Sequence, residues 1–193
     1  MATVPTIGVL ALQGAFIEHR HHLQSLGAAT VEVRLPSDLA ALDGLIIPGG
    51  ESTTIGKLMV NAGLVEPLRA LAATVPLWGT CAGMILLAKA ADRPQPLLEI
   101  MDITVERNAF GRQVDSFERP LDVAALEGGP FPGVFIRAPK LTAASPEVEI
   151  LARLDDGSAV AAQQGRHLVT AFHPELTEDM RFHRYFLTQV QGQ

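Results

Sequence analysis

The single cysteine of the chain, Cys81, lies in a segment that could carry covalent chemistry. The run Gly79-Thr80-Cys81-Ala82-Gly83 has the form glycine, any residue, nucleophile, any residue, glycine. In α/β enzymes this form holds a nucleophile on a sharp turn between a strand and a helix. The helix N-terminus would favour the thiolate there, and the Ala82 N–H could face an oxyanion. A buried, inert thiol is the alternative, but the flanking glycines and the predicted strand–turn–helix context favour a nucleophile.

A nucleophilic cysteine needs a base, and the base needs a group that orients it. His173 directly follows the apolar segment 168–172 and begins the run His173-Pro174-Glu175. Two positions along an extended chain place side chains on the same side, so the Glu175 carboxylate could fix the imidazole tautomer and stabilise the imidazolium. The sequence therefore predicts a triad of Cys81, His173 and Glu175.

The remaining histidines have ordinary interpretations. His19, His21 and His22 fall in one predicted helix, and the spacing of the first and last would permit a metal pair. Because no cysteine or tight set of carboxylates accompanies them, we predict a solvated helix face instead. His167 and His183 are likewise predicted to be surface residues. We expect no metal ion and no cofactor.

A third motif, Pro48-Gly49-Gly50-Glu51-Ser52-Thr53-Thr54, ends another predicted strand. The two glycines would let a backbone amide turn toward an oxyanion, while the serine and threonines suit a helix N-cap. A capped loop without chemistry is the open alternative. The phosphate-binding pattern G-x-x-x-x-G-K-S/T is missing from the sequence, and no G-x-G-x-x-G follows the first strand, so nucleotide binding is not favoured.

Short apolar runs alternate with helical patterns in the first half of the chain. The predicted strands are residues 6–12, 30–35, 45–47 and 76–78, and the predicted helices are 15–26, 52–60, 64–73 and 82–91. This alternation predicts a parallel sheet with helices on both faces.

After Pro94 the pattern changes to short β-rich pieces. Strands are predicted at 100–106, 113–118, 134–136, 148–154, 158–163 and 167–172, and a last helix at 178–190. We therefore predict an α/β fold: a three-layer, open, mostly parallel sheet flanked by helices, with antiparallel strands in the C-terminal half. One domain would span residues 1–193.

Composition narrows the function classes. The chain has 193 residues, a formal net charge of -6, 48% hydrophobic and 19% charged residues, which argues against disorder and against general nucleic-acid binding. One cysteine cannot form an internal disulfide. The apolar start lacks a basic segment and contains Pro5 and Gly8, and no apolar run is long enough for a membrane span, so we expect a cytoplasmic protein.

Together, the three motifs resemble those of the class I, triad-type glutamine amidotransferases. Longer segments resemble the glutaminase subunits of pyridoxal 5′-phosphate synthase in particular. They are GVLALQG at 8–14, VERNAFGRQ at 105–113, VFIRAP at 134–139 and FHPELT at 172–177. The resemblance runs from about residue 7 to residue 186.

This resemblance implies hydrolysis of L-glutamine to L-glutamate and ammonia through a thioester on Cys81. The ammonia would pass to a separate synthase subunit that builds pyridoxal 5′-phosphate from a pentose phosphate and a triose phosphate. The Gly50 and Ala82 amides would face the oxyanion. The residues implied to contact glutamine are Gly50, Glu51, Ser52, Arg107, Ile136 and Arg137.

These assignments suit the substrate. A guanidinium such as Arg107 or Arg137 binds an α-carboxylate well, and Glu51 or the Ile136 carbonyl could accept from the α-ammonium. Without the resemblance, both arginines would be ordinary surface charges. A non-catalytic binding module of the same fold is the alternative function, and a related cysteine hydrolase or chaperone-like enzyme is a third. Retention of Cys81, His173 and Glu175 favours the catalytic interpretation.

Overall fold

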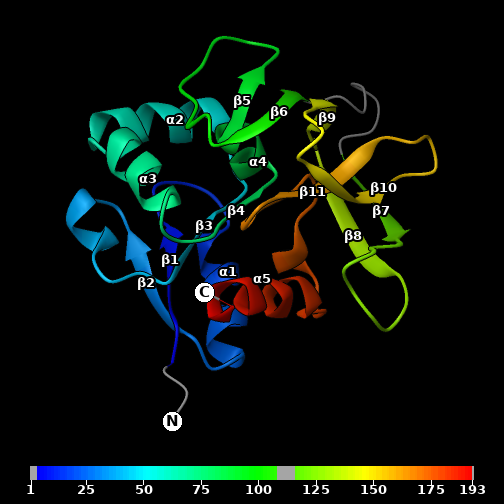
Figure 1. Cartoon of the computed structure of the whole chain (residues 1–193), viewed down its shortest axis with the longest axis horizontal. Helices are drawn as coiled ribbons and strands as arrows, with labels where there is room; N and C mark the ends of the chain where they lie inside the picture. Colours follow the sequence, from blue (N-terminus) through cyan, green and yellow to red (C-terminus); the bar gives the residue numbers. More distant parts are fainter. Residues whose placement is uncertain (1–3, 108–115, 193) are drawn as a thin grey trace.

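The computed structural model describes residues 4–107 and 116–192, which form a large twisted sheet between two groups of helices (Figure 1). Four parallel strands make up its N-terminal half, in the order β2-β1-β3-β4. Their bounds are Thr6–Leu10 for β1, Ala29–Val33 for β2, Gly44–Ile47 for β3 and Leu77–Thr80 for β4. All four residues of β3 and of β4 are buried, as expected for strands covered on both faces.

Helices cover both faces of this parallel half. In Figure 1, α1 and α5 lie together on one side, and α2, α3 and α4 lie on the other. Their bounds are Phe16–Ser25, Arg181–Gln191, Ser52–Asn61, Val65–Ala72 and Ala82–Leu87, respectively, and a 3₁₀ turn, η1, covers Pro36–Leu39. The alternation of side chains along β4 reflects the two layers. The Trp78 ring contacts Phe182, His183 and Phe186 of α5, whereas Gly79 lies against α4.

The C-terminal half extends the same sheet. β12 pairs in parallel with β4, with Leu168 opposite Trp78, and is followed outward by antiparallel β11, β9 and β6 and finally by β5, which pairs in parallel with β6. β10 pairs with β11 off this path. The bounds are Ala88–Ala91 for β5, Met101–Glu106 for β6, Lys140–Ala144 for β9, Glu149–Arg153 for β10, Ala159–Gln164 for β11 and His167–Thr170 for β12. The predicted fold class is confirmed.

A separate antiparallel hairpin, β7 (Ser116–Leu121) and β8 (Phe131–Ile136), lies beside the sheet. It is joined to the end of β12 where the His173 N–H donates to the Val134 carbonyl over 2.8 Å. Buried rings of Phe131 and Phe135 also contact Phe172, so the hairpin shares the hydrophobic core.

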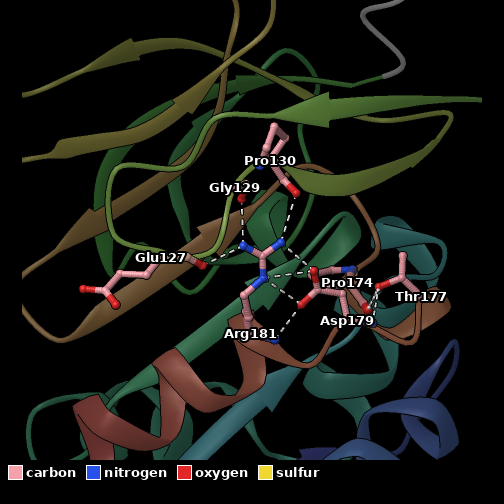
Figure 2. A network of polar contacts seen from close by, with 7 residues as sticks. All are labelled: Glu127, Gly129, Pro130, Pro174, Thr177, Asp179 and Arg181. Atoms are coloured by element: carbon pink, nitrogen blue, oxygen red, sulfur yellow. Dashed lines mark hydrogen bonds and ion pairs between the residues drawn. The ribbon is translucent and has the colours of Figure 1, made fainter.

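Arg181, the first residue of α5, anchors the loop of this hairpin by hydrogen bonds (Figure 2). Its guanidinium donates to the carbonyls of Glu127 at 2.8 Å, Gly129 at 2.7 Å and Pro130 at 3.0 Å, and pairs with the carboxylate of Asp179. One side chain therefore ties the loop before β8 to the segment that leads from β12 into α5.

One predicted element is wrong, one strand was not predicted, and one predicted strand lies partly outside the described residues. The predicted helix 82–91 ends at Leu87, and Ala88–Ala91 is strand β5, because its backbone pairs with β6. Strand β9 was not predicted. The predicted strand 113–118 is described only from Ser116, and residues 108–113 of the motif VERNAFGRQ lie outside the described residues. In the parts of the chain that the structure describes, no helix is long and apolar enough to span a bilayer.

Candidate active site

Cys81 sits on the strained turn that the sequence predicts. It follows β4 and precedes α4, with φ 48° and ψ −104°, a backbone conformation that residues with a side chain rarely adopt. Glycine is required on both sides by close packing. An added Cβ at Gly79 would lie 2.8 Å from the Met84 nitrogen, and one at Gly83 would overlap the Ile47 carbonyl oxygen. The turn thus holds the thiol at the carboxyl end of the parallel strands.

His173 and Glu175 reach this edge because β12 is the neighbour of β4. Both are buried, and the imidazole Nδ1 lies 2.7 Å from the Glu175 Oε1. The two side chains meet through a short 3₁₀ turn, η2 (Pro174–Leu176), rather than along an extended strand as predicted. The structure therefore brings together the three side chains predicted for the triad.

Gly49 forms the floor between the imidazole and the thiol. An added Cβ there would lie 3.0 Å from His173 Nδ1 and 3.3 Å from Cys81 Cβ. Burial alone would lower the pKa of His173, but its interactions with Cys81 and Glu175 raise that pKa to about 10. A histidine that holds its proton beside a cysteine can later give that proton to a leaving group, which is the role of the histidine in a cysteine–histidine pair.

A cavity of about 260 Å³ opens in front of Cys81. It is lined by every residue predicted for the site except Glu175, which is buried behind His173. The cavity wall consists of Gln13, Gly50, Glu51, Ser52, Cys81, Ala82, Ile85, Arg107, Ile136, Arg137 and His173. A larger surface hollow of about 390 Å³ lies beside β10, but it contains none of these groups.

Glu51 and Arg107 both line the cavity and contact one another. Arg107 Nη2 lies 2.9 Å from Glu51 Oε1. The other oxygen of Glu51 caps α2 by accepting from the Thr54 N–H at 2.8 Å and from the hydroxyls of Thr53 and Thr54. Partial burial would raise the pKa of Glu51, but these hydrogen bonds lower it to about 2. Arg107 and Glu51 are the groups expected to bind the α-carboxylate and the α-ammonium of the substrate. In the structure they form an ion pair with each other.

The hairpin supplies the opposite wall. The Ile136 carbonyl oxygen lies 3.9 Å from Cys81 Sγ, and Arg137 follows with a positive φ of 42°. Both side chains are exposed and line the cavity. Their position depends on the hairpin, and therefore on the anchoring by Arg181 shown in Figure 2.

Two polar residues of the site were not singled out by the sequence. Gln13 accepts the Glu51 N–H over 2.8 Å, and Gln95 accepts from Ser52 Oγ at 3.1 Å and from Arg107 at 3.3 Å. Gln13 falls near the end of the run GVLALQG, which carried the resemblance but no assigned role. Gln95 lies among prolines in a loop, and no local pattern indicates its contacts.

The prediction of a solvated face for His19 and of a surface position for His183 is wrong. Both side chains are fully buried, between α1 and α5, because these helices pack against each other over Trp78. His21 is exposed, as predicted. His167 is half-buried instead; it accepts the Leu77 N–H, and burial lowers its pKa to about 4. Within residues 4–107 and 116–192 no cluster of metal-ligating side chains occurs.

Comparisons with known proteins agree with this geometry. The chain is 63% identical over 187 residues to the pyridoxal 5′-phosphate synthase subunit PdxT of Herpetosiphon aurantiacus, covering 94% of this chain and 98% of the relative. It is 60% identical over 189 residues to the protein of that name from Deinococcus radiodurans, covering 94% and 95%. A solved structure described as a glutamine amidotransferase matches with a TM-score of 0.91 and 50% identity, covering 95% and 98%.

A more distant match shows how general the fold is. The structure of PurLQS from Thermotoga maritima shares the fold with a TM-score of 0.71 at 15% identity, covering 96% of this chain and 99% of that one. The sheet, the strained cysteine and the buried histidine–glutamate pair define the class of glutamine amidotransferases. Within that class, the sequence profile of the SNO glutamine amidotransferase family matches residues 9–192, and the chain belongs to this family.

Proposed function

We propose that this protein hydrolyses L-glutamine to L-glutamate and ammonia and supplies the ammonia to the synthase subunit of pyridoxal 5′-phosphate synthase. The observation that carries the proposal is that His173, in contact with Glu175 at 2.7 Å, lines the same cavity of amino-acid size as Cys81. Relatives 60% and 63% identical are pyridoxal 5′-phosphate synthase subunits, which supports the choice of partner.

The reaction begins at the thiolate. The Cys81 sulfur bonds to the side-chain amide carbon of glutamine, and the negative charge passes to the amide oxygen, where the N–H groups of Gly50 and Ala82 would stabilise it. His173, protonated as its raised pKa favours, gives its proton to the departing nitrogen, which leaves as ammonia. The thioester remains on Cys81.

Water completes the cycle. His173, now neutral, takes a proton from a water molecule that adds to the thioester carbon, and the carbon–sulfur bond then breaks to release glutamate and restore the cysteine. Glu175 holds the imidazole through the 2.7 Å contact and stabilises its positive charge in each half of the reaction.

The Arg107–Glu51 pair would bind the α-carboxylate and the α-ammonium of the substrate. In the proposed complex the guanidinium binds the α-carboxylate, and Glu51 or the Ile136 carbonyl accepts from the α-ammonium. A zwitterion can exchange with the existing 2.9 Å ion pair without leaving either charge unpaired, whereas a neutral amide could not. Ser52 and Arg137, which also line the cavity, would complete the contacts.

Two further parts of the proposal concern the number of domains and the cellular compartment of the protein. We infer a single glutaminase domain over residues 1–193, supported by the continuous sheet and by the family match over 9–192. We infer a cytoplasmic protein, because the cytosol keeps thiols reduced and the relatives are bacterial biosynthetic proteins. The non-catalytic alternative has no observation in its favour, since it requires neither the strained cysteine nor the histidine–glutamate contact.

Replacement of the nucleophile tests the activity. We expect Cys81→Ala to abolish glutamate release measured with the synthase partner, while the variant still binds that partner in a pull-down or calorimetric titration. The side chain is small and buried, so the fold should persist. Undiminished glutamate release by Cys81→Ala would refute the proposed mechanism. Gly192→Ala, at the exposed end of α5, is a control far from the cavity.

A further inference from the structure

A buried polar contact continues beyond the three residues of the proposed triad. Glu175 uses Oε1 for His173, while its second oxygen, Oε2, is buried and has no hydrogen bond of normal geometry within the described residues. The nitrogen that lies beside Oε2 is Nε2 of His19, at 3.4 Å, and both side chains are completely buried. A buried carboxylate oxygen needs a donor, and this is the imidazole placed to provide it.

His19 connects three parts of the fold. Its Nε2 also lies 3.2 Å from the hydroxyl of Thr80, the residue directly before Cys81, and its Nδ1 lies 2.9 Å from Nε2 of His183 on α5. The Trp78 ring packs against it in a T-shaped arrangement. The imidazole is therefore held on several sides, and its orientation toward Glu175 is fixed by the packing of α1 on α5.

Only one assignment of the ring protons satisfies the carboxylate. If His183 donates from Nε2 to His19 Nδ1, then His19 carries its proton on Nε2 and directs it at Glu175 and Thr80. In this assignment Nδ1 of His183 carries no proton, and it is the buried nitrogen of the two rings that has no partner within the described residues. The opposite assignment leaves both an N–H of His183 and a charged oxygen of Glu175 unpaired, which costs considerably more.

We propose that His19 is a positioning residue for the reaction: its Nε2–H holds the second oxygen of Glu175 and so fixes the carboxylate against His173. This inference rests on the proposed glutaminase function, which it extends from three residues to four. His19 does not touch the glutamine cavity; it acts on the chemistry through Glu175.

The electrostatics favour a neutral His19. Burial lowers its pKa well below the usual value, and the neighbouring His183, His173 and His22 lower it further, while the carboxylate in contact with it is that of Glu175. As a neutral donor, His19 orients the carboxylate without cancelling its charge. The full negative charge of Glu175 is thus left for the His173 imidazolium.

The test compares three variants of His19. His19→Leu removes the donor, His19→Gln places an amide nitrogen near the position of Nε2, and His19→Asn reaches only toward that of Nδ1. A matched control is His21→Leu, on the exposed side of the same helix. Two measurements apply to each: glutamate release at varied glutamine with the synthase partner present, and the rate of Cys81 alkylation by iodoacetamide against pH, without glutamine or partner. Cys81 is the sole cysteine, so alkylation reports one site.

We expect His19→Leu to lower kcat about tenfold to a hundredfold, the usual effect of losing a hydrogen bond to a charged group, with KM unchanged. Its alkylation profile should move to higher pH, because a carboxylate that His19 no longer holds can turn away from His173 and then stabilises the imidazolium less. His19→Gln should recover part of both effects and His19→Asn should not. His21→Leu should behave as wild type.

Two outcomes would overturn the proposal. One is that His19→Leu folds and keeps the wild-type kcat and alkylation profile. The other is that His19→Gln recovers no more of the kcat and of the alkylation profile than His19→Asn does. The comparison of glutamine with asparagine tests the proposal even if His19→Leu does not fold. If the wild-type protein releases no glutamate but the His19 variants still shift the alkylation profile as expected, the proposed function is refuted while the positioning role of His19 is supported.

Discussion

Replacing Gly49 by alanine probes the geometry of the site with a single methyl group. The backbone of Gly49 is not in the left-handed region, so alanine is compatible with its conformation. The cost comes from contact: the new Cβ would lie 3.0 Å from His173 Nδ1, closer still to Cε1, and 3.3 Å from Cys81 Cβ. Since carbon atoms normally pack at about 3.5–4.0 Å, the imidazole would have to retreat by roughly 1 Å.

The expected fall in kcat follows from the contact that holds the His173 imidazole in place. The Nδ1···Oε1 contact with Glu175 is 2.7 Å, and a retreat of roughly 1 Å would take it beyond hydrogen-bonding distance. A misplacement of this size lowers catalytic rates by about a hundredfold. Overpacking of the core should cost about 1–3 kcal/mol of stability, which the fold can tolerate.

Glutamate release with saturating glutamine and synthase partner measures the expected fall in kcat. Thermal unfolding verifies that the variant is folded, and the matched control is Gly192→Ala, whose Cβ would meet only the Thr188 carbonyl oxygen, at 3.3 Å. A folded Gly49→Ala with the kcat of wild type would refute the reasoning, because it would mean that the position of the His173 ring against Gly49 does not matter for the reaction.

Three further predictions follow, one on recognition of the substrate and two on the pH dependence of stability. Arg107→Ala should raise KM for glutamine with little change in kcat, because the α-carboxylate is bound equally in ground and transition states; a fall in kcat alone would assign Arg107 another role. In thermal unfolding against pH, His173, whose folded pKa is about 10, should contribute stability that is complete below about pH 6.5 and is lost toward pH 10. His183, whose pKa burial lowers to about 3, should contribute stability that is complete above about pH 6.5 and is lost as pH falls toward 3. His173→Gln should flatten the alkaline limb and His183→Gln the acid limb, and unchanged limbs would contradict these assignments.

Local chemistry made the centre of the site predictable from the sequence. The turn at Cys81 is encoded by neighbouring glycines whose added side chains would collide with backbone, and the strand before it is an apolar run. His173 and Glu175 are two residues apart, so their pairing needed no knowledge of the fold. What the sequence could not supply was that β12 lies next to β4, because no local pattern indicates which distant strands pair.

Properties that depend on packing between distant elements were mispredicted. His19 and His183 have polar side chains that are usually exposed on surface helices, and their burial follows only from the contact of α1 with α5. The Ala-rich segment 88–91 has high helix propensity, but pairing with β6 overrides that preference. The anchoring of the hairpin by Arg181 depends on three carbonyls about fifty positions away.

The place of β12 in the sheet has a consequence for synthesis of the protein. β4 is wholly buried, yet its neighbour on one side, β12, begins only at His167, so most of the chain must leave the ribosome before this edge is covered. Until then the nascent N-terminal half carries an apolar, unpaired strand edge of the kind that associates with other chains. His173 and Glu175 arrive with β12, so closing the sheet and giving Cys81 its base are one event. A nascent chain cannot present an activated thiol before its fold is complete.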